Sequence, residues 1–149
     1  MRILVVNWLD RENPRAGGAE IHLHEIFGRL AARGHEVTLL CSGWAGASAE
    51  TELDGIRVVR AGTRYTFALH ARAAFQDRLG GGREVDVIVE DVNKCPLFCT
   101  YWSASPVVTL VPHLFGVTAF RQELPPVASV VWAAEKLMPA AYRNSPILV

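Results

Sequence analysis

The stretch RILVVN at residues 2–7, followed by a helical pattern at residues 19–33 and by HEVTLLC at residues 35–41, decides the fold. An uninterrupted apolar run such as RILVVN is typical of a strand that is buried on both faces of a parallel sheet. Between residues 19 and 33 the apolar side chains recur at helical spacing, and Gly34 follows where a helix commonly ends. The three segments therefore predict a strand–helix–strand unit.

The same alternation continues through the rest of the chain. Further strands are expected at residues 56–60, 85–89, 106–111 and 146–149, with helices at residues 65–79 and 127–143 and a loop at Pro125 and Pro126. Strands that alternate with helices build a mostly parallel sheet that is covered on both faces. The sequence thus predicts an α/β fold, a single Rossmann-like, doubly wound domain over residues 1–149.

Composition excludes several classes of protein. Half of the 149 residues are apolar and 20% are charged, which suits one folded domain and argues against disorder. Fifteen basic and fifteen acidic residues cancel, so the positive charge typical of a nucleic-acid-binding protein is absent. Three cysteines are too few for a disulfide framework, and no secretory signal or bilayer-spanning run is visible. We expect a cytoplasmic protein without a nucleic-acid partner.

Ligands of doubly wound sheets bind beyond the carboxyl ends of the strands, which points first to the loop with Gly17 and Gly18. Glycines let a backbone come close to a ligand, and the amides of a helix N-terminus suit a phosphate. The loop has neither the G-x-G-x-x-G pattern of dinucleotide sites nor the lysine of a P-loop. The alternative is a flexible loop in which Gly18 is a passive cap and Glu20 complements the helix dipole.

Two later segments lie at the same predicted edge. Glu90, Asp91 and Asn93 follow one strand, where they are either ligand contacts or turn and cap residues. His113 follows the next strand and could donate a hydrogen bond or carry a proton, or else be held by a backbone carbonyl. No spacing of histidine, cysteine and carboxylate residues suggests a metal site.

Four arginines, Arg60, Arg64, Arg72 and Arg78, are expected to form a solvated face. A phosphate-rich partner or an anionic membrane surface is the alternative reading of this group.

Three motifs carry a resemblance to a known family. They are the loop PRAGGAE at residues 14–20, RGHEVTLLC at residues 33–41, and VDVIVEDVNK…PVVTLVPHLFG within residues 85–116. Together they resemble glycosyltransferase family 4, a group of retaining, nucleotide-sugar-dependent enzymes with the GT-B fold. The resemblance covers essentially the whole chain.

This resemblance implies an organisation and a chemistry. GT-B enzymes have two Rossmann-like domains, of which the N-terminal one mainly binds the acceptor and the C-terminal one holds the nucleotide sugar. The chain resembles only the N-terminal half, so the donor domain would be absent and the chain inactive alone. The implied partners are a sugar acceptor and the nucleotide-sugar co-substrate, with no other cofactor and with possible peripheral contact at the inner face of the membrane.

The resemblance also implies site residues. Gly17 and Gly18 match the loop that approaches the donor diphosphate and the acceptor. The catalytic histidine of the family corresponds to His113, or to the position that Pro112 occupies here. The expected substrate-binding residues are Gly17, Gly18, Glu20, Glu90 and Asn93.

Two other functions compete with this interpretation. A non-catalytic Rossmann-like domain that binds a small ligand or a protein would show the same alternation of strands and helices. A dinucleotide-dependent oxidoreductase is disfavoured, because the glycine fingerprint is missing and no acidic ribose-binding residue follows the second strand.

Overall fold

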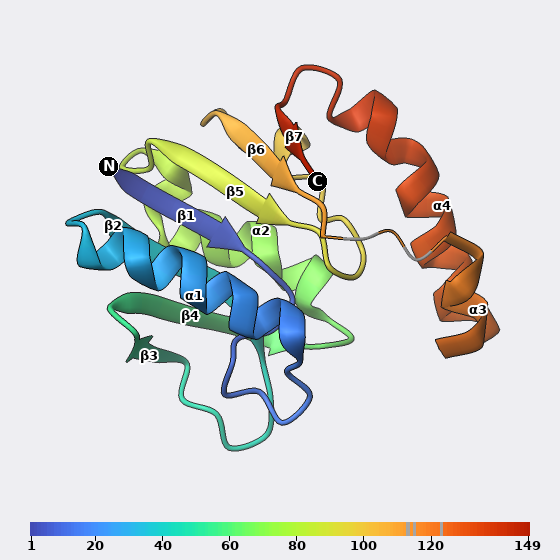
Figure 1. The fold of residues 1–149 in the computed structure, drawn as a ribbon, viewed down its shortest axis with the longest axis horizontal. Coiled ribbons are helices and arrows are strands. Elements are labelled where there is room, and N and C mark those ends of the chain that lie inside the picture. The colour runs from blue at the N-terminus through green and yellow to red at the C-terminus, as the bar shows by residue number, and fades with distance from the viewer. Residues whose placement is uncertain (113, 115, 123) are drawn as a thin grey trace.

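The computed structural model describes residues 1–112, 114, 116–122 and 124–149, and all structural statements below concern these residues. Figure 1 shows one sheet with helices on both of its faces. Its strands are β1 (Arg2–Val6), β2 (Glu36–Gly43), β3 (Glu50–Leu53), β4 (Ile56–Thr63), β5 (Val87–Asp91), β6 (Val107–Leu110) and β7 (Ile147–Leu148). Its helices are α1 (Gly18–Ala32), α2 (Phe67–Arg78), α3 (Ala119–Gln122) and α4 (Pro125–Ala141), with short 3₁₀ turns η1 (Gly80–Gly82), η2 (Cys99–Tyr101) and η3 (Gly116–Thr118).

The strands follow the order β3-β4-β2-β1-β5-β6-β7. Every neighbouring pair is parallel except β3 and β4. The chain runs outward from β1 through β2 to the edge strand β3 and turns back to β4, which lies between β3 and β2. It then crosses to the other side of β1 and runs outward again from β5 to β7. The direction of winding therefore reverses between β1 and β5, and this switch point is where ligands of doubly wound sheets bind. The predicted Rossmann-like, doubly wound α/β fold is confirmed.

Alternation along β1 builds both layers of the core. Ile3 and Val5 belong to the apolar cluster that α1 covers, whereas Leu4 and Val6 belong to the cluster that α2 covers. Figure 1 shows these two helices on opposite faces of the sheet. Successive side chains of a strand point to opposite faces, so a strand buried on both sides must be apolar at every position. This requirement explains the uninterrupted run ILVV.

One strand was not predicted, and one local expectation was wrong. The edge strand β3 is polar (ETEL) and was missed, and Asp54 and Gly55, both at positive φ, form the tight turn that returns the chain to β4. The loop expected at Pro125 and Pro126 is instead the first turn of α4. Proline suits that place, because the first amides of a helix have no partner within the helix. No helix in the described ranges is long and apolar enough to cross a membrane.

Candidate functional site

Glu20 connects the two sides of the switch point. It lies in the first turn of α1, is 2% exposed, and its Oε2 accepts a hydrogen bond from the backbone N–H of Gly17 at 2.7 Å. Its Oε1 accepts one from Nδ2 of Asn93, beyond β5, at 2.9 Å. The ammonium of Lys94 lies 3.7 Å from the same oxygen. One buried carboxylate thus holds the glycine loop after β1 against the loop after β5.

Gly18 begins α1 and faces open space. A Cβ atom built on Gly18 would have no neighbour within 4 Å, and its φ is outside the left-handed region. By contrast, Gly34 and Gly55 have φ values of +87° and +75°, which favour glycine for the backbone alone. Neither the backbone nor the packing therefore requires a glycine at position 18. The absent side chain leaves open space at the start of α1, next to Gly17, whose Cβ would lie 3.8 Å from Oε2 of Glu20.

Asp91, the last residue of β5, is an unpaired buried carboxyl group. It is 3% exposed, and its Oδ1 has no hydrogen-bond partner. Burial, together with the negative charge of Glu20, raises the pKa of Asp91 to about 7, while Lys94 acts in the opposite direction. Near neutral pH this group can therefore either accept or donate a hydrogen bond.

Unpaired oxygens gather at the switch point. Five buried side-chain polar atoms lack a partner in the described part of the chain, and three of them are Oδ1 atoms at the ends of β1 and β5. They belong to Asn7, one residue past β1, and to Asp91 and Asn93. We call Asn7, Gly17, Gly18, Glu20, Asp91, Asn93 and Lys94 the switch-point cluster. Buried polar atoms are normally paired, so this concentration distinguishes the cluster from the rest of the core.

Glu90 is separated from this cluster. Its carboxylate accepts hydrogen bonds from the backbone amides of Leu97, Phe98 and Cys99 and from the hydroxyl of Tyr142. Alternation along β5 places Glu90 on the opposite face from Asp91. Through these hydrogen bonds, the carboxylate of Glu90 holds the loop after β5 to the end of α4. The expected role of Glu90 in substrate binding stays a prediction.

The structure therefore brings Gly17, Gly18, Glu20 and Asn93 together. His113, the expected catalytic residue, lies outside the described residues.

A buried ion pair anchors the start of the glycine loop. Nε and Nη2 of Arg60 donate to the two carboxylate oxygens of Asp10 at 2.8 and 3.1 Å, and the ring of Trp44 lies 4.5 Å from the guanidinium. Burial raises the pKa of Asp10, but hydrogen bonds from Arg60 and from the Glu12 amide outweigh this and hold it below its ordinary value. The expectation that Arg60 lies on a solvated face was wrong, since it is 6% exposed. Its acidic partner, 50 residues away in the sequence, is what permits its burial.

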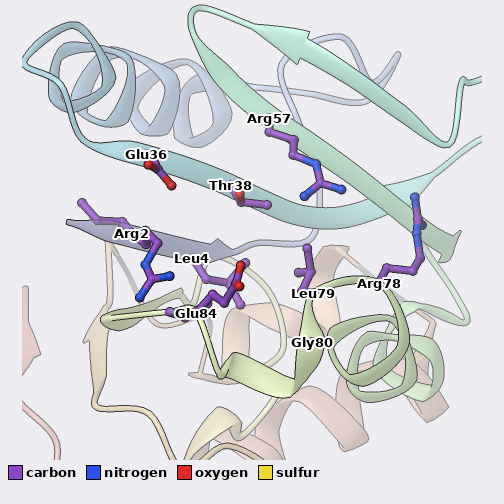
Figure 2. Close-up of a pocket in the computed structure, with 11 residues that line it drawn as sticks. Arg2, Leu4, Glu36, Thr38, Arg57, Arg78, Leu79, Gly80 and Glu84 are labelled. Carbon is purple, nitrogen blue, oxygen red and sulfur yellow. The ribbon is translucent and has the colours of Figure 1, made fainter.

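A cavity of about 250 Å³ opens at the other edge of the sheet. Figure 2 shows side chains from the beginnings of β1, β2 and β4 and from the end of α2 around it. Its arginines have acidic partners: Arg2 pairs with Asp86, and both Arg57 and Arg78 pair with Glu50. This cavity lies at the amino ends of the strands, away from the edge where doubly wound sheets bind their ligands.

No group of three or more histidine, cysteine, aspartate or glutamate side chains in the described ranges could hold a metal ion. Within these ranges, the switch-point cluster offers hydrogen-bond acceptors, one ammonium group and an open approach beside Gly18. Asn7 and Lys94 are members that sequence reasoning did not select, and Asp91 was considered as a ligand contact but not placed among the expected substrate-binding residues. Asn7 directly follows one buried strand and Asp91 ends another, but only the strand order makes β1 and β5 neighbours.

Comparison with known proteins agrees with this architecture. A family model described as Glycosyltransferase Family 4 matches residues 16–145. No curated protein matches. Among solved structures, a sucrose-phosphate synthase from Thermosynechococcus elongatus superposes with a TM-score of 0.70 at 16% sequence identity. The match covers 99% of this chain and 42% of that one, and at this identity it concerns the fold alone.

Proposed function

Since the chain belongs to glycosyltransferase family 4, we propose that it forms the acceptor-binding half of a retaining enzyme that transfers a sugar from a nucleotide sugar. The family match confirms the resemblance that the motifs indicated. Because the chain spans 42% of the synthase that it resembles, the proposal assigns the donor-binding half to a second Rossmann-like domain.

The observation that carries the proposal is the open approach at Gly18 beside the buried bridge between Glu20 and Asn93. A glycine that neither backbone nor packing requires, at the switch point, is what a site that admits a ligand closely would have. In the proposal, Gly17 and Gly18 leave room for the acceptor and the donor diphosphate. Glu20 positions the loop, because it accepts a hydrogen bond from the Gly17 amide. Asn93 holds Glu20 in place through the hydrogen bond between their side chains.

The proposed reaction needs little acid–base machinery from this half. The acceptor hydroxyl attacks the anomeric carbon, the bond to the diphosphate breaks, and the nucleoside diphosphate leaves with the electron pair and takes up the proton of the attacking hydroxyl on a phosphate oxygen. Donors that surround the diphosphate stabilise this leaving group. If no protein nucleophile takes part, the anomeric configuration is retained only when the acceptor attacks the same face of the sugar ring that the leaving group departs from. We assign a hydrogen bond with the donor sugar to His113. If the family's histidine corresponds to the position of Pro112, this chain lacks that side chain and His113 has only a neighbouring role.

The test is transfer of radiolabelled sugar by the longest natural chain that contains residues 1–149. UDP-glucose, UDP-N-acetylglucosamine and GDP-mannose serve as donors, with soluble and lipid extracts as acceptors. We expect transfer from one donor, with the anomeric configuration retained, and none by residues 1–149 alone, since both walls of the site must position the reactants. Replacing His113 by alanine should lower turnover about tenfold or more.

Each alternative result has a meaning. Binding of sugars without transfer by the longer chain would support a non-catalytic binding domain instead. Turnover by residues 1–149 above a heat-treated control would contradict the assignment of the donor site to a second domain. The cytoplasmic location and the contact with the inner face of a membrane stay predictions, which cell fractionation of the longer chain tests.

A further inference from the structure

We propose that the switch-point cluster binds hydroxyl groups of a neutral sugar or polyol, with Oδ1 of Asn7, Asp91 and Asn93 as the hydrogen-bond acceptors. This inference rests on the proposed function and names the chemical class of the acceptor. It predicts that the part of the acceptor held at this point carries hydroxyl groups and no phosphate.

The unpaired oxygens are the first reason. A buried polar atom without a partner lowers stability, so three at neighbouring strand ends are unfavourable for the fold. The orientation of the Asn93 amide follows from its chemistry: Nδ2 must face the carboxylate of Glu20, which only accepts, and Oδ1 therefore faces away from it. A ligand that donates hydrogen bonds would relieve this cost.

Charge is the second reason. Glu20 and Asp91 contribute two carboxyl groups, while Lys94 contributes one ammonium group, 3.7 Å from Glu20. Phosphate sites need hydrogen-bond donors and positive charge, whereas this cluster presents mainly acceptors. The raised pKa of Asp91 is consistent with a hydroxyl partner, because a carboxyl group near its pKa can accept from one hydroxyl and donate to another.

Access to the three oxygens requires a movement. The three oxygens lie below the surface, so a hydroxyl group reaches them only if a neighbouring group moves. Lys94 is suited to this, since its side chain is 35% exposed and is joined to the cluster through the long contact with Glu20. The open space at Gly18 provides room for the rest of the ligand.

The experiment measures amide chemical shifts of residues 1–149 during titration with myo-inositol and methyl α-D-glucopyranoside, and with glucose 6-phosphate for comparison. We expect the neutral probes to shift amides in residues 17–20 and 91–94, with dissociation constants on the order of 10 mM, and the phosphate group to add no affinity. Asp91→Leu, which has the same branched skeleton of four heavy atoms, should weaken the neutral probes about tenfold, the effect of one lost hydrogen bond. Its thermal midpoint should not fall, because the variant removes an unpaired buried group. Asp77→Leu, on the exposed side of α2, is the matched control and should bind as the wild type does.

Several results would overturn the inference. One is the absence of shifts at these amides up to roughly 100 mM of either neutral probe. Equal binding by Asp91→Leu would mean that water alone occupies the oxygens, and tighter binding of glucose 6-phosphate with shifts at the amides of residues 91–94 would mean an anion site there. Lower stability of Asp91→Leu with unchanged binding would assign Asp91 to the core. Transfer by the longer chain separates the two proposals: if Asp91→Leu leaves the KM for the acceptor unchanged while transfer continues, this inference fails and the proposed function stands.

Discussion

Glu20 and Asn93 meet across the switch point of the sheet, 73 residues apart in sequence, through a buried hydrogen bond of 2.9 Å. The same carboxylate accepts the amide of Gly17. The conformation of the glycine loop after β1 therefore depends on a side chain that follows β5. A substitution after β5 should therefore change the conformation of the loop after β1.

Replacing Asn93 by alanine should loosen the glycine loop. Glu20 loses a charge-assisted hydrogen bond in a buried place, so we expect the free energy of unfolding to fall by about 1–3 kcal/mol. Hydrogen exchange at the Gly17 amide should become faster, and urea unfolding measures the stability. Asn144→Ala, on an exposed side chain, should change stability by less than about 0.5 kcal/mol. Unchanged exchange at Gly17 would show that the bridge does not hold the loop.

Replacing Arg60 by methionine should destabilise the protein strongly. The variant leaves Asp10 buried without its counter-charge, which costs about 3–5 kcal/mol in comparable pairs. The double variant Asp10→Asn/Arg60→Met should lose less unfolding free energy than Arg60→Met alone, because no unpaired charge remains at position 10. Arg72→Met, on the exposed side of α2, serves as the control in the same denaturant measurements. Equal losses in the single and double variants would argue against the ion pair as the cause.

Asp91 should make stability depend on pH. Its pKa rises from 3.8 to about 7 on folding, so the folded state holds a proton that the unfolded chain releases. The stabilisation is complete below about pH 4, falls as the pH rises toward 7, and then levels off. Asp91→Asn should lack this fall, so the difference in unfolding free energy between variant and wild type should grow by at most roughly 4 kcal/mol over that interval.

Urea unfolding of both proteins across this pH range measures that difference. Asp10, Glu50 and Asp86, whose pKa values are lowered, contribute the opposite trend in both proteins and so cancel. Glu20 and Lys94 are the charged groups that act on Asp91, and both remain in the variant. A difference that does not change with pH would mean that Asp91 is ionised in the folded state at all these pH values.

Removing the hydroxyl group of Tyr142 should weaken the attachment of α4. This hydroxyl donates to Glu90 at 2.7 Å and accepts from the amide of Phe98 at 3.1 Å. We expect Tyr142→Phe to lower the free energy of unfolding by about 1–2 kcal/mol. Tyr65→Phe is the control, because Tyr65 is 72% exposed. A change in Tyr142→Phe no larger than in the control would show that the hydroxyl contributes nothing.

Replacing Gly18 by valine should affect activity and not folding. A Cβ at this position meets no atom within 4 Å, so stability should change by no more than about 1 kcal/mol. In the longer chain, turnover should fall about tenfold or more, equivalent to roughly 1.4 kcal/mol of transition-state stabilisation. Ala32→Val, at the last turn of α1, is a control that also introduces a valine on the same helix. Normal turnover with Gly18→Val would remove this loop from the proposed site.

Local patterns were enough to predict most of the fold. The uninterrupted run at Ile3–Val6, the helical spacing of Leu23 and Phe27, and Gly34 at the helix end each act over a few residues, and each was placed correctly. The polar strand β3 was missed, because an edge strand has no buried face that would impose an apolar alternation.

What the sequence by itself determined was the set of elements, their alternation, and which loops lie at the carboxyl edge of the sheet. What only the tertiary structure decided was which polar residues meet there. The order of β1 and β5 pairs Glu20 with Asn93, alternation along β5 turns Glu90 away from Asp91, and Asp10 draws Arg60 into the interior. The pairs Glu20–Asn93 and Asp10–Arg60 join residues 50 or more positions apart. Propensity and periodicity act along the chain, whereas hydrogen bonds and ion pairs between distant segments depend on strand order and register, which are fixed only when the whole sheet forms.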